Sequence, residues 1–146
     1  MLVIRPLESG HVKQEKLESS EERAVDSHNL LLRRAIYYDY DAYNVKEEYR
    51  QMLEAHGKYL LAHREVKVRI EGNCDERGSR EYNLALGQRR AESIKRALAL
   101  IGVPTGQIEA VSFGSEKPKA ATRDEQGYAE NRRSDLIYTA SKSASK

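Results

Sequence analysis

The chain has 146 residues, a length that suits one domain with a usable hydrophobic core. Its 25 Lys and Arg residues and 23 Asp and Glu residues are interleaved and give a formal charge of +2, which argues against nucleic acid as a partner. The single cysteine excludes an intramolecular disulfide and a cysteine-cluster zinc site. No apolar run approaches the ~20 residues that span a bilayer.

The two ends of the chain are polar. Residues 1–33 contain no apolar stripe long enough to build a core, so we predict a flexible tail or tether there, with at most a transient helix within 14–26. Residues 140–146 are rich in Ser and Lys and are predicted to be disordered. The folded domain is therefore predicted to span residues 34–139.

The domain is predicted to open with a strand at residues 35–40 and a helix that follows it. Asn44 is the predicted N-cap of this helix, and Glu47, three residues on, would complete a capping box. Residues at helical spacing predict the inner stripe of the helix: Val45, Tyr49, Leu53, His56 and Leu60. A histidine on such a stripe is more often a satisfied core residue than a ligand.

The second predicted strand, residues 66–71, alternates between apolar and charged side chains. Val66, Val68 and Ile70 fall on one face, and the opposite face carries Lys67, Arg69 and Glu71. A sheet covered on both faces would instead show a continuous apolar run. We therefore expect helices on one face of the sheet and water on the other.

The longest predicted helix covers residues 80–101, and Gly102 ends it, with Pro104 shortly after. At ~100° per residue, the predicted core stripe consists of Leu84, Gly87, Ala91, Ile94, Leu98 and Ile101. Gly87 would let the helix approach the sheet closely. A second line of side chains, on the flank of this stripe, consists of Asn83, Leu86 and Arg90, whereas Arg89 points towards solvent.

Further strands are predicted at 108–113 and 135–138, with a loop at 116–123 and a short helical turn at 124–129 between them. Strands that alternate with helices imply crossover connections and at least some parallel pairing. The predicted fold class is α/β (α+β): a two-layer sandwich of βαβαβ type, in which a mixed sheet carries its helices on one face.

Asp75 and Arg90 are the first candidate site residues. Asp75 lies in the loop between the second strand and the long helix, and ligands of α/β proteins collect beyond the carboxyl ends of strands. A loop carboxylate and a helix guanidinium can present opposite charges in one cleft, as a zwitterionic ligand such as an amino acid requires. On the residues alone, a helix-leading acid and a surface salt bridge from Arg90 to Glu92 or to the acidic first strand are the more common explanations.

The segment 71–91 closely resembles the peptidoglycan-binding domain of the OmpA-like family. The family pattern is an Asp-containing loop after a strand, then Gly, then Asn, Leu and Arg-Ala along a helix. Here it reads Asn73-Cys-Asp75, Gly78, Asn83-Leu-Ala-Leu86 and Arg89-Arg-Ala91. The match extends from residues 36–41 through 112–118 to 131–138, and the signature at 75–91 looks most like the subgroup of peptidoglycan-associated lipoproteins (Pal).

The resemblance implies a site for meso-diaminopimelate, a residue of the peptide stem of peptidoglycan whose side-chain end carries an ammonium and a carboxylate. It assigns Asp75 to the ammonium and Arg90 to the carboxylate, roles that suit a multiple acceptor and a planar donor fork. The other implied pocket residues are Ser79, Asn83, Leu86, Tyr40 and Asp41. Most relatives have Thr where this chain has Cys74, a weaker hydrogen-bond partner, so no ligand contact is expected there.

The resemblance leaves Arg132 and Arg133 open, because either could reach the ligand's carboxylate and both could be rim charges. It also implies the periplasmic face of the outer membrane, reached through a signal peptide and an acylated N-terminal Cys. Met1–Ile4 is too short for the apolar core of a signal peptide. We expect that the export and anchor region has been removed from this chain; the alternative is a relative that lost its anchor.

Three functions compete at this point. The first is a non-catalytic module that tethers the outer membrane to the cell wall as part of the Tol-Pal system. The second is a protein-interaction module whose main partner is another envelope protein, by resemblance the periplasmic propeller protein of the Tol system. The third is an enzyme, which is not expected because the sequence shows no metal cluster, nucleophile elbow or phosphate loop. No cofactor and no metal are expected.

Overall fold

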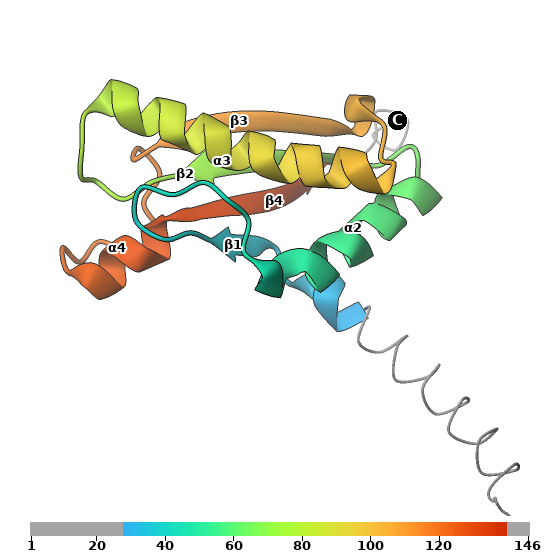
Figure 1. The fold of residues 1–146 in the computed structure, drawn as a ribbon, viewed down its shortest axis with the longest axis horizontal. Helices are drawn as coiled ribbons and strands as arrows, with labels where there is room; N and C mark the ends of the chain where they lie inside the picture. The colour runs from blue at the N-terminus through green and yellow to red at the C-terminus, as the bar shows by residue number, and fades with distance from the viewer. Residues whose placement is uncertain (1–27, 140–146) are drawn as a thin grey trace, which may run out of the picture. The chain divides into compact units, whose positions relative to one another are not determined.

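The computed structural model describes residues 28–139, of which 34–139 belong to one compact unit. Most of the predicted tails, residues 1–27 and 140–146, lie outside the described residues. Of the remaining tail residues, 28–32 are helical. The elements of the compact unit (Figure 1) are β1 (Ala35–Tyr37), η1 (Glu47–Tyr49), α2 (Arg50–Ala62), β2 (Lys67–Asn73), α3 (Arg80–Ile101), η2 (Thr105–Gln107), β3 (Ile108–Gly114), α4 (Glu125–Asn131) and β4 (Arg133–Thr139).

The four strands form one mixed sheet in the order β1-β4-β2-β3. β4 pairs antiparallel with both β1 and β2, whereas β3 pairs parallel with β2. The parallel pair is joined by the crossover helix α3, which lies across β2 and β3 (Figure 1). The predicted fold class is therefore confirmed.

The core lies between the sheet and the layer formed by α2 and α3. Burial of apolar side chains at this junction is the main force that holds the layers together. The fully or almost fully buried residues there are Met52, Leu60, Val68, Ile70, Ile94, Leu98 and Leu136. His56 of α2 is also fully buried, and its Nδ1 lies 2.6 Å from the Tyr138 hydroxyl of β4, which confirms a satisfied core histidine.

Helix α3 has the predicted bounds. The Ser79 hydroxyl oxygen accepts a hydrogen bond from the Tyr82 backbone N–H at 3.0 Å and caps the N-terminus, and Gly102, with a φ of 119°, ends the helix in the left-handed conformation. Four residues of the predicted core stripe are buried, Gly87, Ala91, Ile94 and Leu98, whereas Leu84 and Ile101 are only half-buried. Burial also extends to the flank that carries Leu86 and Arg90, where Arg90 donates to the Asp39 and Ala42 carbonyls.

Two glycines fix the distance between α3 and the sheet. A Cβ on Gly72 of β2 would collide with the Gly87 carbonyl oxygen of α3. A Cβ on Gly87 would lie 2.9 Å from the Gly72 carbonyl oxygen and would collide with the Ser112 hydroxyl of β3. The predicted close approach at Gly87 is thus confirmed, and Gly72 is the counterpart that sequence analysis missed.

The region between β1 and α2 differs from the prediction. β1 ends at Tyr37 because the chain turns through residues 39–42, where Asp41 adopts a left-handed φ of 60°. The predicted capping box is wrong: η1 begins at Glu47 with Lys46 as its N-cap residue and no side-chain cap. The Lys46 ammonium instead lies 2.9 Å from the Asp39 carboxylate and ties the loop to the helix start. We call residues 38–46 the β1–η1 loop.

The face of the sheet opposite the helices is only partly open. Glu71, which alternation places towards water, is 2% exposed, because its carboxylate accepts from Arg69 Nε at 2.9 Å and from Lys117 Nζ at 3.0 Å. Lys119 Nζ lies 2.7 Å from the Tyr37 hydroxyl, so the loop after β3 crosses this face. Burial raises the pKa of Glu71, but the bonds from Lys117 and Arg69 outweigh it and hold this pKa below its ordinary value.

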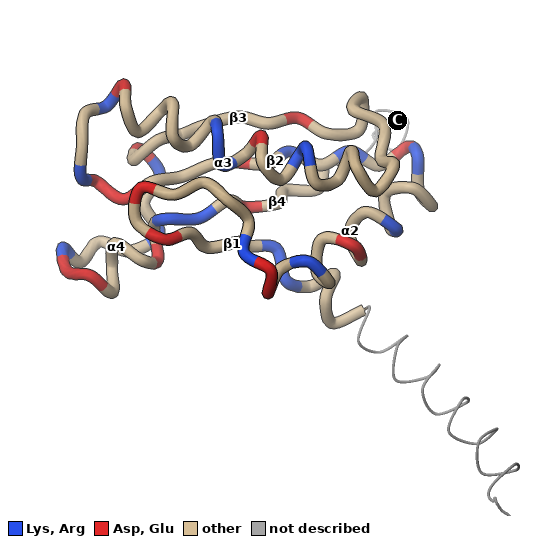
Figure 2. Tube along the Cα trace, viewed as in Figure 1, with Lys and Arg blue, Asp and Glu red and all other residues tan. Residues whose placement is uncertain are grey.

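Charged segments of both signs alternate along the described trace (Figure 2). Within residues 28–139, no helix combines the length and the apolar character that a membrane crossing requires. In the same range, no cluster of three or more His, Cys, Asp or Glu side chains is arranged to hold a metal ion.

Candidate functional site

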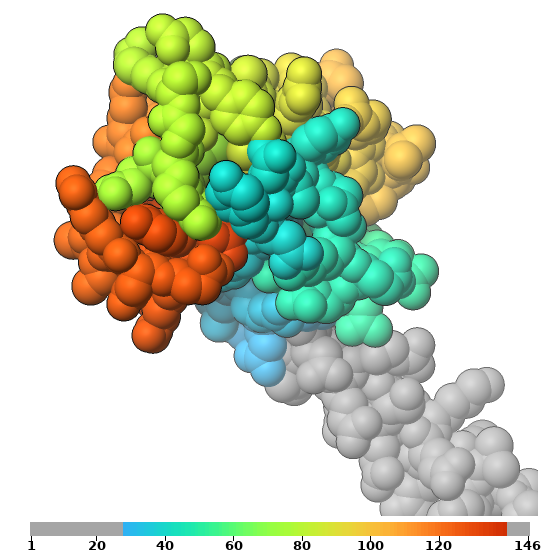
Figure 3. All heavy atoms as spheres, turned by 60° about the vertical axis from the view of Figure 1, so that its left-hand side comes forward, coloured from blue at the N-terminus to red at the C-terminus, as the bar shows by residue number. Residues whose placement is uncertain are grey.

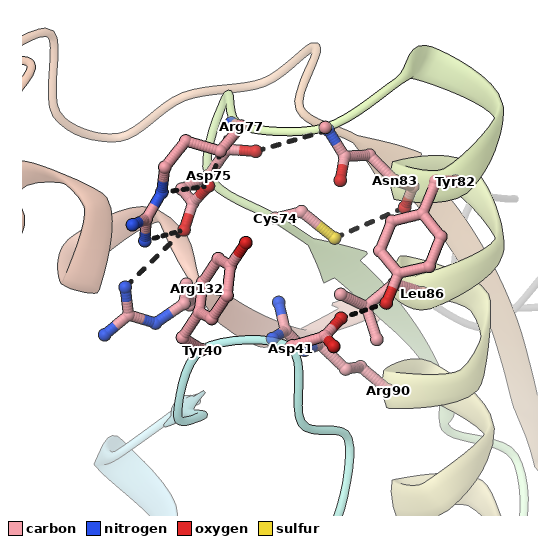
Figure 4. A pocket seen from close by; sticks show the side chains of 11 residues that line it. Tyr40, Asp41, Cys74, Asp75, Arg77, Tyr82, Asn83, Leu86, Arg90 and Arg132 are labelled. Carbon is pink, nitrogen blue, oxygen red and sulfur yellow. Dashed lines mark hydrogen bonds and ion pairs between the residues drawn. The ribbon is translucent and has the colours of Figure 1, made fainter.

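A small pocket lies at the carboxyl end of β2. Three segments meet there (Figure 3): the β1–η1 loop, the β2–α3 loop with the first turns of α3, and the junction of α4 and β4. Its volume is about 40 Å³, room for one or two water molecules. The pocket is lined by Tyr40, Asp41, Cys74, Asp75, Arg77, Gly78, Tyr82, Asn83, Leu86, Arg90 and Arg132 (Figure 4). All of the predicted site residues except Ser79, which caps α3, line it.

Asp75 is the one carboxylate among the buried lining residues, with 4% of its surface exposed. Its Oδ1 accepts from the Arg77 backbone N–H at 2.9 Å and from Arg77 Nε at 3.2 Å. Its Oδ2 accepts from Arg77 Nη2 at 2.8 Å and from Arg132 Nη1 at 3.5 Å. Burial raises the pKa of Asp75, but the hydrogen bonds from Arg77 and then Arg132 outweigh it and hold this pKa below its ordinary value. Asp75 is therefore ionised at neutral pH.

Arg77 was not among the predicted site residues. Its guanidinium lies 4.3 Å from the ring centre of Tyr40 and 4.3 Å from that of Tyr128, and Glu125 is 3.9 Å away. The bond from the Arg77 backbone N–H to the side chain two residues earlier is the pattern of an Asx-turn. An Asp followed two positions later by Arg in a polar loop is the one sequence signal that could have indicated this pair.

Arg90 is fully buried and binds the backbone of two other segments. Its Nε donates to the Ala42 carbonyl at 2.7 Å, its Nη2 to the Asp39 carbonyl at 3.1 Å and its Nη1 to the Asn73 carbonyl at 2.9 Å. Three of the five guanidinium N–H groups thus hold the β1–η1 loop and the end of β2 against α3. Arg89 is exposed, as the helix register predicts.

The structure separates Arg132 from Arg133. Arg132 is 7% exposed and contacts three groups: the Tyr38 carbonyl at 3.0 Å, Glu125 at 2.9 Å and, in the pocket, Asp75. Arg133 lies on the other face of the sheet, where its Nε is 3.0 Å from Asp135. Three guanidiniums, from Arg77, Arg90 and Arg132, therefore line the pocket that holds Asp75.

The remaining lining residues shape the mouth and the floor. The Tyr82 hydroxyl donates to the Asp41 carboxylate and so connects α3 to the β1–η1 loop (Figure 4). Asn83 Nδ2 donates to the Asp75 carbonyl at 3.4 Å. Cys74 Sγ donates to the Asn83 carbonyl at 3.2 Å, and burial, opposed by nearby Arg90, raises the pKa of the Cys74 thiol to about 11. The thiol is thus protonated and engaged with the backbone.

Comparison with known proteins identifies the family of the chain. The OmpA family pattern matches residues 37–132. A peptidoglycan-associated lipoprotein of Pasteurella multocida is 50% identical over 103 residues, which cover 70% of this chain and 69% of that protein. The corresponding protein of Haemophilus influenzae is also 50% identical over 103 residues, covering 70% of this chain and 67% of that protein.

Solved structures extend the comparison to the fold. The peptidoglycan-associated lipoprotein from Burkholderia pseudomallei matches with a TM-score of 0.75 at 51% identity, over 75% of this chain and 93% of that chain. The C-terminal domain of Helicobacter pylori MotB, 17% identical, shares the fold with a TM-score of 0.67 over 74% of this chain and 84% of that chain. The chain therefore belongs to the OmpA family, in the branch that contains the peptidoglycan-associated lipoproteins.

Proposed function

We propose that the chain binds the diaminopimelate-containing peptide stem of peptidoglycan without covalent chemistry, and so tethers the outer membrane to the cell wall from its periplasmic face as part of the Tol-Pal system. The observation that carries the proposal is the pairing of opposite charges in one pocket, where ionised Asp75 lies beside the guanidiniums of Arg90 and Arg132. The names of the similar lipoproteins support the same ligand class.

Each pocket residue has a role in this proposal. Asp75 accepts hydrogen bonds from the side-chain ammonium of diaminopimelate. Arg90 donates its two N–H groups that do not bind backbone carbonyls to the ligand's carboxylate. Asn83 and Leu86 contact the aliphatic part, and Tyr40 and Asp41 close the mouth.

Isothermal titration with a diaminopimelate-bearing stem peptide tests the proposal. Asp75→Asn should weaken binding of this peptide roughly tenfold or more, because a charged hydrogen bond contributes ~1.5–3 kcal/mol. It should barely affect a stem that carries 2-aminopimelate, which has the carboxylate but no side-chain ammonium. Absence of heat with the wild-type protein, beside a peptidoglycan-binding positive control, would refute the proposal.

A control variant separates loss of the site from general damage. Glu116→Gln removes a carboxylate that pairs with Arg80 at the surface, 2.6 Å away, and should bind both peptides as the wild type does. Thermal unfolding is measured in parallel, because Asp75 precedes α3 and its charge can stabilise that terminus by ~0.3–1 kcal/mol. If Asp75→Asn weakened both peptides equally at unchanged stability, Asp75 would organise the loop and not contact the ammonium.

A second function uses the same surface. Two exposed tyrosines line the pocket, Tyr40 and Tyr82, with 60% and 49% of their surfaces exposed, and Tyr43 of the β1–η1 loop is 43% exposed. Aromatic side chains are enriched at protein interfaces. They support contact with the periplasmic propeller protein of the Tol system. Pull-down of that protein with and without added stem peptide tests this; equal capture in both arms would refute a shared surface.

A further inference from the structure

We propose that the Arg77 guanidinium occupies the place of the ligand's ammonium on Asp75 and must leave before that ammonium binds, so that Arg77 limits the affinity for ligands that carry an ammonium. The inference rests on the proposed function, which concerns the same pocket. It adds a residue of the binding site that acts by competing with the ligand's ammonium for Asp75.

The acceptor capacity of Asp75 is the first argument. An ionised carboxylate offers about four lone-pair sites on its two oxygens. In the pocket these sites receive the Arg77 backbone N–H, Arg77 Nε, Arg77 Nη2 and Arg132 Nη1. A ligand ammonium therefore finds no open acceptor on Asp75 until one of the donors withdraws.

The surroundings of the two arginines indicate which donor withdraws. The Arg132 side chain is 8% exposed and is fixed by the Tyr38 carbonyl at 3.0 Å and by Glu125 at 2.9 Å. The Arg77 side chain is 35% exposed, and its guanidinium contacts aromatic rings and Asp75 at the rim of the pocket. Arg77 can therefore move into solvent at lower cost than Arg132.

A second position for the guanidinium already exists. Glu125 Oε1 lies 3.9 Å from Arg77 Nη2, and its side chain is 71% exposed. A guanidinium that leaves Asp75 can approach Glu125 while it stays near the Tyr128 ring. The ligand's ammonium then replaces the Arg77 guanidinium on Asp75, so the Asp75 carboxylate keeps a positively charged partner. A ligand without an ammonium has no group to replace the guanidinium, so Arg77 stays on Asp75 and does not compete with that ligand.

The experiment compares Arg77→Ala with a matched control. Arg123→Ala removes an arginine that is 78% exposed, pairs with Glu76 at 3.3 Å and is not itself a lining residue. Calorimetry on each full-length variant measures affinity for a stem peptide with diaminopimelate and for one with 2-aminopimelate. Arg77→Ala should bind the diaminopimelate peptide roughly two- to five-fold tighter, the range expected when a partly exposed ion pair no longer competes. It should bind the 2-aminopimelate peptide no tighter, and Arg123→Ala should match the wild type.

A second readout does not depend on binding. In an NMR titration of the free protein, the pKa of the Asp75 carboxyl should rise in Arg77→Ala and stay unchanged in Arg123→Ala. An unchanged Asp75 pKa in Arg77→Ala, or equal or weaker binding of diaminopimelate by this variant, would overturn the inference and leave the proposed function intact. If wild type and variant both failed to bind either peptide, the proposed function and the inference would fall together.

Discussion

At the scale of single residues, Arg90 combines two roles that a sequence pattern does not distinguish. Its guanidinium lines the pocket and also donates to carbonyls of Asp39, Ala42 and Asn73. Removal of the side chain leaves three carbonyl acceptors without their donors, and each unsatisfied buried acceptor lowers the free energy of unfolding by ~1–3 kcal/mol. The residue therefore supports the β1–η1 loop as well as any ligand.

We predict that Arg90→Ala abolishes measurable binding of the stem peptide and lowers the free energy of unfolding by at least about 2 kcal/mol. Arg89→Ala, one position away and exposed, should change both quantities little, by ~0.5 kcal/mol at most. Titration calorimetry and denaturant unfolding measure the two effects. Equal losses in the two variants would contradict the helix register.

Residue-level prediction from sequence succeeded where helix periodicity sets the geometry. Asn83, Leu86 and Arg90 lie three or four positions apart, so the pattern alone places them on one flank of a helix. Arg77 reaches Asp75 through a local turn of the β2–α3 loop, whereas Arg132 comes from the α4–β4 junction, and its approach to Asp75 depends on how the chain folds back. Periodicity carries no information about such contacts, which is why these pocket arginines were missed or left ambiguous.

At the scale of elements, the contact between β2 and α3 positions the pocket. Gly72→Ala would force a Cβ against the Gly87 carbonyl, so α3 would have to move away from the sheet. We predict a loss of ~1–3 kcal/mol in the free energy of unfolding, typical of overpacking, together with weaker binding of the stem peptide. Denaturant unfolding and calorimetry measure these changes.

Gly106→Ala provides the matched control for this substitution. A Cβ at Gly106 meets nothing within 4 Å, so the same chemical change should leave stability and binding almost unaltered. If Gly72→Ala were as stable as Gly106→Ala, the sheet and helix would have room to separate without cost, and the glycine contact would not fix their distance.

The ends of elements were predictable where local signals decide them. Ser79 and Gly102 are a helix cap and a helix stop by their chemistry, and the bounds of α3 were predicted correctly. The start of η1 was predicted wrongly, because Lys46 pairs with Asp39 across the loop. A capping rule that considers only neighbouring residues does not include such a contact.

At the scale of the whole molecule, the surroundings shift the pKa values of three carboxyls in different directions. The pKa values of Asp75 and Glu71 lie below their ordinary values, so their ionised forms stabilise the fold above the ordinary carboxyl pKa, and this stability is lost as pH falls through the folded-state values. Asp135 is the opposite: burial, opposed by Arg133, raises its pKa. Its contribution favours the fold in acid and disappears as pH rises through that raised value.

We predict that Asp135→Asn increases the free energy of unfolding at neutral pH by about 1 kcal/mol or less, since the side chain is partly exposed. The gain should vanish below the ordinary pKa of an aspartate, where the wild-type carboxyl is protonated in both states. Denaturant unfolding at a series of pH values measures it. A loss of stability at neutral pH would mean that the charge pair with Arg133 outweighs the cost of burial.

The mixed sheet was predictable from the order of strands and helices, but the order of strands within it was not. Alternation shows which face a residue occupies and not which strand lies beside it. The loop after β3 that covers Glu71 was likewise invisible in the sequence, because Lys117 reaches this carboxylate from 46 positions away.

The place of β4 in the sheet has a consequence for how the chain acquires its structure. The last strand in the sequence lies between β1 and β2, and the Tyr38–Ser134 hydrogen bond beside it joins residues 96 positions apart. Until residues up to 139 are available, β1 has no neighbour, β2 has one free edge, and Asp75 has no Arg132. Contacts this distant in sequence form late because long loops must close first. A nascent chain therefore stays without its complete four-stranded sheet until synthesis has passed β4.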